Sequence, residues 1–431
     1  MLGIASWQTA RKDKGDLESG EMILTGVILN TPTLQKRSQS FLLDVGNNRI
    51  LVSVKPSLML SAGDKVEVHA YVQKMIRYSD SESYSDYWTR RGIYYRVNAQ
   101  FGGTIRIRSP SKGLSAVGAK WRAGTYDRLL TNIPIREAKT TMGIIAGQQG
   151  LVPQDVYESM KKTGTLHLLA TSGAHVLIVT TLLMLFLKQL PLARGFQIWV
   201  VILFVIIFAI AVGLRPPVVR AALMLVCYCL IYLFRRTPDG LSALGLSSMI
   251  YLFFEPFAVF DAGFHLTFMI VLVLLLFLPN SVMWLRVQIY KKTRDKLTSI
   301  IYFSLGISLL TTCIAQLGAI PLIMHHFGMI SIISPIANLL TAPFLPLIYL
   351  GTFLAQITGY FSSAISKGFD VMITGVVSSW IEWTNISLAK VPFSHVETPS
   401  LPFIAVVVYG VVLIMLSKPH EKPKELLLYE D

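Results

Sequence analysis

The chain has 431 residues, of which 53% are hydrophobic and 15% are charged, and its net charge is +14 at pH 7. A soluble domain usually carries about 25% charged residues, so this composition excludes a chain that is soluble throughout. Its three cysteines, Cys227, Cys229 and Cys313, all lie in apolar runs, which excludes a disulfide framework and a zinc site built on a cysteine pair.

Residues 1–110 predict a small soluble β-barrel. Five short segments between residues 21 and 108 are rich in β-branched and aromatic residues and are bounded by turn residues, as strands are. Five such strands fit a Greek-key barrel, and their order indicates one like the oligonucleotide/oligosaccharide-binding (OB) barrel. Before the fifth strand, residues 78–92 are polar and aromatic, which predicts a solvated loop or, alternatively, a loop that contacts a ligand.

Residues 111–163 predict helices that link the barrel to the rest of the chain. Apolar residues such as Trp121 and Leu129 recur among basic residues such as Arg122 and Arg128. A basic amphipathic helix beside apolar spans often lies at a membrane interface. We therefore expect a basic amphipathic linker here.

Residues 164–417 predict a polytopic α-helical membrane bundle of about eight or nine spans. A run of about 18 or more apolar residues is long enough to cross a bilayer. The expected spans are 165–187, 197–213, 218–234, 240–254, 258–279, 300–323, 331–358 and 401–417. Prolines interrupt 331–358, which indicates a broken helix. A ninth segment, 369–388, carries two tryptophans and a glutamate and is expected to be amphipathic.

Lysine and arginine residues predict the orientation of the bundle. Basic residues gather in alternate loops, at 188–194, 235–236 and 286–296. Loops of this kind stay in the cytoplasm. The barrel is then expected outside, and the basic tail 418–431 in the cytoplasm.

Polar side chains within the apolar runs are the candidates for a functional site. Such groups are costly at membrane depth and usually face a cavity or the interior of a bundle. A lipid-facing guanidinium at Arg220, for example, costs about 2.5–3.5 kcal/mol. The candidates for lining a path through the bundle are His167, Ser172, His175, Arg215, Arg220, Asp261, His265, Gln316 and Asn338.

Simpler interpretations of these residues stay open. His167 and His175, eight residues apart, could be hydrogen-bonded packing residues. Asp261 shares a helical face with His265 at the i, i+4 spacing, but it could also cap the following helix. No HExxH motif is present, so no metal or other cofactor is predicted. A hydrolase with Ser172 as nucleophile lacks a supporting motif.

Several ordered motifs connect the chain to a known family. They are GTLHLLATSGAHVLIV, LRPPVVRAALM, RRTPDGLSALGLSSMIYLFFEPFAVFDAGFHLTF, QLGAIPLIMHHFG and SPIANLLTAPF. Together they resemble the successive landmarks of the ComEC-type competence family, the DNA-uptake channels of naturally transformable bacteria. The resemblance spans residues 140–350, and the barrel is similar to the family's external OB-like domain.

The resemblance implies a channel in the bacterial cytoplasmic membrane that passes single-stranded DNA and is not itself an enzyme. It also implies three protein partners: an external DNA receptor, a separate nuclease and a cytoplasmic ATPase. Many family members carry a C-terminal metallo-β-lactamase-like domain and hydrophobic helices ahead of the barrel, and this sequence shows neither. We therefore expect an incomplete reading frame or a shortened family member; the alternative is that the orientation is the reverse of the one given above. The pore could be built by one chain or by a homodimer.

The runner-up hypothesis is a proton-coupled secondary transporter of a small anion. Asp261, His265 and His175 would then exchange protons, and the broken helix in 331–358 would help to form the site. Such a transporter would carry internal inverted repeats, and the sequence shows none. DNA uptake therefore remains the preferred prediction.

Overall fold

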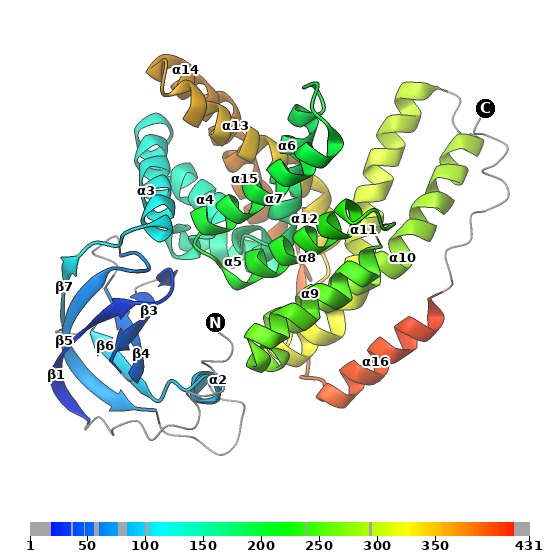
Figure 1. Ribbon diagram of the computed structural model, residues 1–431. Helices are drawn as coiled ribbons and strands as arrows, with labels where there is room; N and C mark the ends of the chain where they lie inside the picture. The colour runs from blue at the N-terminus through cyan, green and yellow to red at the C-terminus, as the bar shows by residue number, and fades with distance from the viewer. Residues whose placement is uncertain are drawn as a thin grey trace.

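The computed structural model describes residues 19–35, 38–46, 48–55, 60–75, 84–99, 103–237, 239–292 and 295–417. An N-terminal β-barrel lies beside a larger assembly of helices, residues 114–417, which we call the helical body (Figure 1). The expected tail 418–431 lies outside the described residues, as do residues 78–83 of the predicted loop 78–92.

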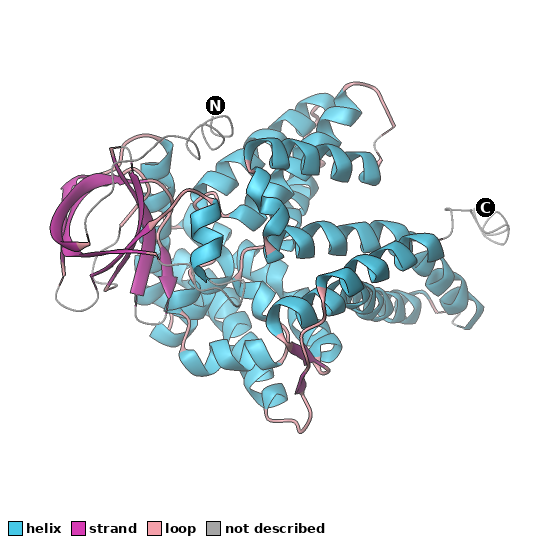
Figure 2. Ribbon diagram, turned by 90° about the horizontal axis from the view of Figure 1, so that it is seen from below, coloured by secondary structure: helices cyan, strands magenta, loops and turns pink. Residues whose placement is uncertain are grey.

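Seven strands build the sheet of the barrel. They are β1 (Gly20–Ile28), β2 (Thr33–Gln35), β3 (Ser38–Val45), β4 (Asn48–Val54), β5 (Lys65–Lys74), β6 (Tyr95–Ala99) and β7 (Thr104–Ser109). The neighbours run in the order β1-β3-β4-β6-β5, and β5 pairs again with β1, so five strands close a ring. Figure 2 shows these strands curving at one side of the helices. The five predicted strands and the closed barrel are confirmed.

Alternation of apolar and polar residues explains why this segment closes on itself. Along β5, Val66, Val68 and Val72 are 0% exposed, whereas Tyr71 points outward and is 48% exposed. Side chains alternate between the two faces of a strand, so each strand supplies one apolar face to the interior. The barrel therefore has its own core, separate from that of the helices.

The predicted loop before β6 contains a short helix, α2 (Tyr84–Arg90). In Figure 1 this helix projects from the barrel on the side of the helical body. The prediction of a loop at 78–92 is therefore wrong for residues 84–90, which are helical.

The linker region is helical, as predicted. It contains α3 (Leu114–Asn132), α4 (Ile135–Ala146), the 3-10 turn η1 (Gln149–Leu151) and α5 (Gln154–Lys162). These helices contribute to the interior of the protein, because Leu129, Ala138 and Met142 are 0% exposed within the main hydrophobic core. Arg122 is also buried, at 7% exposure. Whether a domain boundary lies at residue 163 stays a prediction.

The remaining helices follow the predicted apolar runs. They are η2 (Leu166–Leu169), α6 (Gly173–Leu187), α7 (Arg194–Ala211), α8 (Pro216–Leu233), α9 (Gly240–Phe254), η3 (Pro256–Phe260), α10 (Ala262–Lys292), α11 (Lys296–Phe327), α12 (Ser334–Thr341), η4 (Ala342–Phe344), α13 (Leu345–Thr358), α14 (Ser363–Phe369), the π-helical η5 (Asp370–Gly375), α15 (Val376–Ala389) and α16 (Phe403–Leu416). Two short strands, β8 (Met329–Ser331) and β9 (His395–Glu397), pair as a small antiparallel sheet that joins two of the connections.

Five helices in the described chain are long and apolar enough to cross a membrane. They are Arg194–Ala211, Pro216–Leu233, Ala262–Ile289, Leu297–Phe327 and Ser334–Thr358. Three predicted spans correspond to shorter apolar helices, Gly173–Leu187, Gly240–Phe254 and Phe403–Leu416. The protein therefore has the helices of a membrane bundle, but the predicted count of eight or nine spans is not confirmed.

Two of the predicted spans, 165–187 and 331–358, can be compared with the helices in detail. The first was expected to start at residue 165, but α6 starts at Gly173, after the turn η2 and the residues Thr171 and Ser172. The interruption predicted in 331–358 is present, because the turn η4 at Ala342–Phe344 separates α12 from α13.

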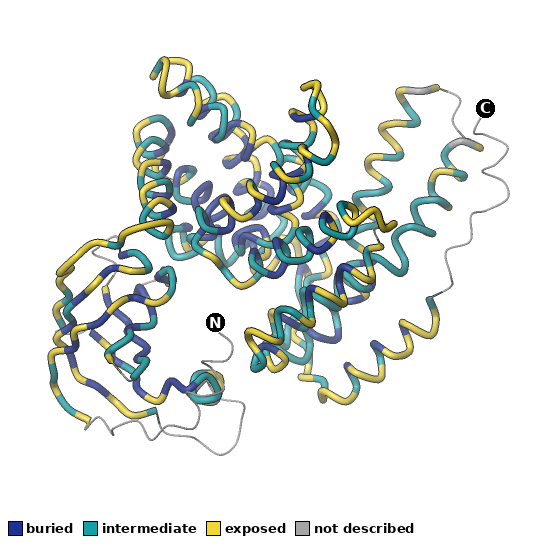
Figure 3. Tube along the Cα trace, viewed as in Figure 1, coloured by how far each residue is buried: buried dark blue, intermediate teal, exposed yellow. Residues whose placement is uncertain are grey.

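Burial is concentrated in one part of the helical body. The main core joins residues of α3 to α8 with α13 and α15. In contrast, only 6% of the apolar window in α10 is buried, against 44% for Ser334–Thr358. Figure 3 shows the same difference, with buried segments near α4, α5 and α15 and mostly intermediate or exposed ones along α10, α11 and α16. The long outer helices thus leave wide apolar surfaces available to lipid.

Candidate functional site

Arg220 lies near the start of α8 and is only 3% exposed. Its Nη2 donates to the Gly263 carbonyl oxygen and to the Thr267 hydroxyl oxygen, both on α10 and both at 3.0 Å. Its guanidinium carbon lies 5.6 Å from the centre of the Tyr251 ring on α9. Among the described residues no carboxylate forms an ion pair with it. Three apolar helices therefore meet around a buried cation.

Asp261 joins the barrel to the helical body. Its Oδ2 lies 2.5 Å from Nη2 of Arg91, which directly follows α2, and each side chain is 19% exposed. The Arg91 guanidinium covers the Tyr87 ring at 4.0 Å, and that of Arg90 covers the Phe260 ring at 4.8 Å. The partner of Asp261 in the structure is therefore an arginine that follows α2, and not His265, with which the sequence grouped it.

Tyr87 lies in the same contact, outside the apolar helices. Burial raises the pKa of its hydroxyl, the charge of Arg91 opposes that shift, and the Asp261 carboxylate adds to it. The phenol is therefore neutral at physiological pH and packs as a ring under Arg91. This contact therefore joins α2 to the helical body, and the Tyr87 hydroxyl does not exchange protons there.

His265 does not pair with Asp261, although the two residues are four apart. Asp261 precedes α10, and His265 Nδ1 lies 3.4 Å from Nε2 of His326 on α11. The Nε2 of His265 donates to the Val259 carbonyl oxygen at 2.7 Å. Next to it, His325 Nδ1 donates to a backbone carbonyl of the segment before α16. These histidines hold α10, α11 and α16 together at one end.

His167 and His175 lie in different structures. His167 is exposed in the turn η2, and its Nδ1 donates to the Gly164 carbonyl oxygen at 3.1 Å. His175 is 0% exposed in α6 and its Nδ1 accepts from the Ser172 backbone N–H at 2.7 Å, as part of a capping box. The His175 ring lies 5.8 Å from that of Tyr349, and its Nε2 has no hydrogen-bond partner. Ser172 is thus a helix cap.

The other candidates are dispersed. Arg215 occupies the N-cap of α8, and its side chain forms no hydrogen bond or ion pair with a described residue, although its Nε is buried. Asn338 of α12 is 8% exposed and donates to Ser334 Oγ at 3.2 Å, while its Oδ1 has no partner. Gln316 is half-buried on α11. The nine predicted residues therefore do not converge on one point.

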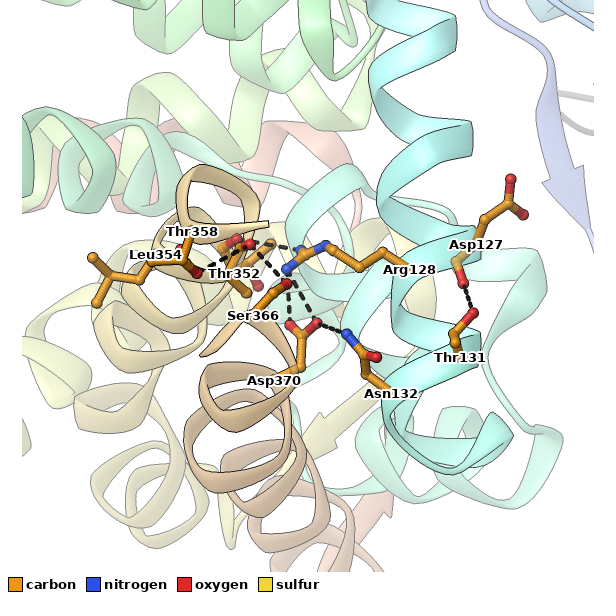
Figure 4. Close-up of polar contacts among 10 residues, drawn as sticks. Asp127, Arg128, Thr131, Asn132, Thr352, Leu354, Thr358, Ser366 and Asp370 are labelled. Carbon is orange, nitrogen blue, oxygen red and sulfur yellow. Dashed lines mark hydrogen bonds and ion pairs between the residues drawn. The ribbon is translucent and has the colours of Figure 1, made fainter. Parts of the chain in front are cut away.

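Sequence reasoning did not find a buried ion pair at the π-helical segment η5. Asp370 is 0% exposed, and both its oxygens lie 3.1 Å from Nη1 of Arg128 on α3. Asn132 Nδ2 also donates to Asp370 at 2.8 Å, and Arg128 Nη2 donates to the Thr352 carbonyl oxygen at 3.3 Å (Figure 4). A single aspartate within the apolar segment 369–388 was the available signal, but its partner lies 242 residues away.

A second pair links α4 to α5 and α15. Arg136 Nε lies 2.6 Å from Oε2 of Glu382, which is 4% exposed, and Arg136 Nη2 lies 2.5 Å from Oδ2 of Asp155. The hydrogen bond from Arg136 lowers the pKa of Asp155. Close by, the hydroxyls of Thr163 and Thr165 both donate to Asn385 Oδ1. These contacts lie within the helical body and serve its packing.

Nothing in the described chain gathers three or more His, Cys, Asp or Glu side chains in a metal-binding arrangement. The chemistry that the candidate residues offer is therefore hydrogen bonding and positive charge. Three arginines at buried or half-buried positions form no ion pair with a carboxylate of the described residues. They are Arg122, Arg215 and Arg220, and we call them the unpaired arginines.

Comparisons with known proteins relate the helical body to a family. A model of the family described as Competence protein matches residues 144–423. ComE operon protein 3 of Bacillus subtilis (strain 168) is 28% identical over 291 residues, which are 66% of this chain and 35% of that protein. An uncharacterized protein of Aquifex aeolicus (strain VF5) is 34% identical over 130 residues, 30% of each chain.

The chain therefore spans about a third of the length of the Bacillus relative, 35% of it. No solved structure matches. The arrangement described above, with a barrel docked on a helical body that buries several arginines, has to be interpreted from its own geometry.

Proposed function

Because the chain belongs to the Competence protein family, we propose that it is a membrane conduit that passes one strand of DNA into the cell during natural transformation. In this proposal the helical body forms the path and carries out no covalent chemistry. Degradation of the other strand by a separate nuclease is part of this proposal.

The observation that carries the proposal is the burial of Arg220 without a carboxylate. A cation in an apolar helix is costly unless it meets a partner or a polar cavity. Arg220 contacts the Gly263 carbonyl, the Thr267 hydroxyl and the Tyr251 side chain, and its Nε has no partner. These neutral groups leave the positive charge uncompensated. A strand of phosphates moving past α8 would supply the missing negative charge without any need for base recognition.

The proposed domains follow the sequence prediction. The barrel, residues 1–110, would lie outside the bacterial cytoplasmic membrane, linker helices would occupy 111–163, the channel 164–417 and a cytoplasmic tail 418–431. The alternation of basic loops supports this orientation.

An OB-like barrel is supported by the order of the strands. The ring contains five strands, which in chain order are β1, β3, β4, β5 and β6. Around the barrel the first three are neighbours in that order, followed by the fifth and then the fourth. The third and fifth of them, β4 and β6, run parallel. OB barrels bind oligonucleotides on a strand face. We therefore propose that the barrel contacts single-stranded DNA before it reaches the helices.

The conduit also needs partners. An external DNA receptor would deliver the duplex, a nuclease would remove one strand, and a cytoplasmic ATPase would pull the other. Wide apolar surfaces on α10, α11 and α16 would face lipid. The pore would be built by one chain or by a homodimer.

The test is uptake of labelled duplex DNA into a nuclease-protected state, in a transformable host that lacks its own channel. Arg220→Ala should reduce uptake at least about tenfold, because charge-assisted hydrogen bonds contribute roughly 1.5–3 kcal/mol each. Arg286→Ala is the matched control. Arg286 is also an arginine of an apolar helix, but it is exposed and covers a Phe303 ring at 6.0 Å.

Equal membrane insertion of all variants must be confirmed first. Uptake that survives Arg220→Ala, or is lost equally in Arg286→Ala, would contradict the role given to Arg220. An inserted wild-type protein without uptake would contradict the conduit itself. Proton-coupled anion flux that disappears in Asp261→Asn would then favour the transporter hypothesis.

A further inference from the structure

Four segments meet where the barrel touches the start of α8. They are the middle of α3 with Arg122, the end of α4 with Gly147, the residues before α6 with Thr171, and the turn from α7 to α8 with Arg215. We call this meeting point the arginine seam. It is independent of Arg220, which faces α9 and α10.

Arg215 and Thr171 pack tightly against Gly147. A methyl group placed on the Gly147 Cα would lie 2.7 Å from Thr171 Oγ1 and 3.0 Å from Arg215 Nε. Gly147 ends α4 in the left-handed region, at φ +65°, which other residues rarely adopt. The absence of a side chain at Gly147 lets both polar atoms pack against it, so that they lie close to each other.

Both polar atoms are buried and have no hydrogen-bond partner. Thr171 is 0% exposed and its Oγ1 is unsatisfied, as is Arg215 Nε. A buried hydroxyl or guanidinium N–H without a partner costs about 1–3 kcal/mol. Two such donors in one place indicate that an acceptor belongs between them.

Arg122 adds a second positive charge. It is 7% exposed, and its Nη1 donates to the Ala211 carbonyl oxygen at 2.6 Å, at the end of α7. Burial lowers the pKa of Arg122 to about 10, and burial together with the charge of Arg122 lowers the pKa of Arg215 to about 10. Both groups are still cationic at pH 7, so they repel each other.

The start of α8 makes this charge more unusual. Arg215 occupies the N-cap, where Ser, Thr, Asp or Asn is usual, and a cation is disfavoured at the positive end of a helix. Pro216 and Pro217 follow and have no backbone N–H to offer. An anion bound here would therefore be held by the two guanidinium groups and the Thr171 hydroxyl rather than by the helix backbone.

We propose that Arg215, Thr171 and Arg122 form an oxyanion site that binds one phosphodiester group of the DNA strand as it passes from the barrel to the helices. Arg215 Nε and Thr171 Oγ1 donate to the phosphodiester oxygens, and the Arg122 charge stabilises them at longer range. The proposal rests on the proposed function and specifies where the strand is held.

The barrel favours a DNA phosphate over the phosphate of a lipid headgroup. Gly213, in the turn before Arg215, lies directly under Thr31 of the barrel: a methyl group on its Cα would meet Thr31 Oγ1 at 2.5 Å. Strand β2 also contacts η1 beside Gly147. The seam thus lies beneath the barrel, where a strand bound to the barrel would leave it.

The test measures binding of a fluorescent oligothymidine to the purified full chain in detergent, at several salt concentrations. Arg215→Gln should weaken binding at least about tenfold, because it removes a charge-assisted hydrogen bond. It should also reduce the slope of log K against log salt by about 0.7, the value for one phosphate contact of a single strand. Arg215→Lys should restore the slope but not the full affinity, since lysine keeps the charge and loses the planar fork.

Two further variants separate the site from folding and from general charge. Thr171→Val keeps the shape of the side chain and removes the hydroxyl, and should weaken binding about threefold. Arg194→Gln removes one exposed charge at the start of α7 and should leave affinity and slope unchanged. Thermal unfolding of each variant checks that the fold is retained.

Each outcome decides one question. Affinity and salt slope that are unchanged in Arg215→Gln, while DNA uptake also persists, would overturn the site and leave the proposed function standing. Wild-type protein that neither binds the oligonucleotide nor supports uptake would overturn the function. If phosphatidylglycerol copurifies with the wild type but not with Arg215→Gln, and oligonucleotide binding is equal in both, the seam is a lipid site and the proposal fails.

Discussion

Five arginines of the helical body, of which all but Arg136 are buried or half-buried, fall into two groups. Arg128 and Arg136 face carboxylates, whereas Arg122, Arg215 and Arg220 face carbonyls, hydroxyls or no partner. Burial does not separate the groups, because the Arg128 side chain is 14% exposed and Arg220 is 3% exposed. What separates them is whether the fold itself supplies the counter-charge.

The paired arginines lie between α3, α4 and the segment from α14 to α15, where they stabilise the packing of those helices. The unpaired arginines lie at the start of α8 and beside it, close to the barrel. Placing a charge in a protein interior costs several kcal/mol unless it is paired. A pair that the fold completes is a structural feature, whereas for the unpaired arginines we propose an anion that comes from outside.

The largest expected effect is on the completed pair. Arg128→Ala leaves the Asp370 carboxylate buried with only Asn132 as a side-chain partner, and removing one partner of a buried pair costs about 3–5 kcal/mol. We expect a large drop in the thermal midpoint, measured by size-exclusion chromatography after heating. The double variant Arg128→Gln with Asp370→Asn should recover most of the loss. Equal stability of Arg128→Ala and wild type would remove the distinction between the two groups.

A carboxylate added to the arginine seam should convert an unpaired arginine into a paired one. Thr171→Asp places an anion next to Arg215 Nε, and should weaken oligothymidine binding at least about tenfold, since charge-assisted pairs are worth roughly 1.5–3 kcal/mol. Its thermal midpoint should not fall. Thr171→Asn is the neutral control of similar shape. Tight binding by Thr171→Asp would show that no anion occupies this space.

The pair between the barrel and the helical body should have an intermediate effect. Asp261→Asn removes the charge opposite Arg91, whose side chain is 19% exposed, and should cost about 1 kcal/mol. Hydrogen exchange in α2 should then be about fivefold faster, a ratio that corresponds to roughly 1 kcal/mol. The exchanged pair Arg91→Asp with Asp261→Arg should restore slow exchange; if it does not, the contact is not electrostatic.

The smallest expected effect is on the exposed part of the Arg136 pair. Hydrogen bonding to Arg136 lowers the pKa of Asp155 in the folded protein. The contribution of the ionised Asp155 to the stability of the fold is therefore fully present above the pKa of an unfolded aspartate, about 3.9. It is lost as the pH falls through the lower pKa that Asp155 has in the folded protein. Because the Arg136 and Asp155 side chains are 42% and 57% exposed, we expect less than about 1 kcal/mol. The stability difference between wild type and Asp155→Asn should be constant from pH 7 to 5 and vanish below pH 3 or so; a difference that grows in acid would contradict this.

The periodicity of apolar residues was sufficient to predict most helices and strands, but it could not predict which side chains contact each other. Alternation along β1, β3, β4, β5 and β6 predicted the barrel, because each strand carries its own inward face. Strand β2 has only three residues, and β7 reads TIRIRS with largely exposed side chains. Neither had enough apolar pattern to be found.

The candidate residues show the same limit. Asp261 and Arg220 were identified because a charge in an apolar run is conspicuous on its own. Their partners, Arg91 for one and Gly263 with Thr267 for the other, come from segments 170 and 43 to 47 residues away. Arg122 was assigned to the polar side of an amphipathic helix, and only packing against α7 places it inside.

The burial of α4 also determines how the protein can be divided for biochemistry. The similarity to the family begins at residue 144, but α4 starts at Ile135, and Ala138 and Met142 before that point are 0% exposed. A recombinant fragment trimmed to the matched residues would cut this helix within its buried part and expose apolar surface. Fragments meant to be soluble in detergent should therefore keep all of α3 and begin before Leu114.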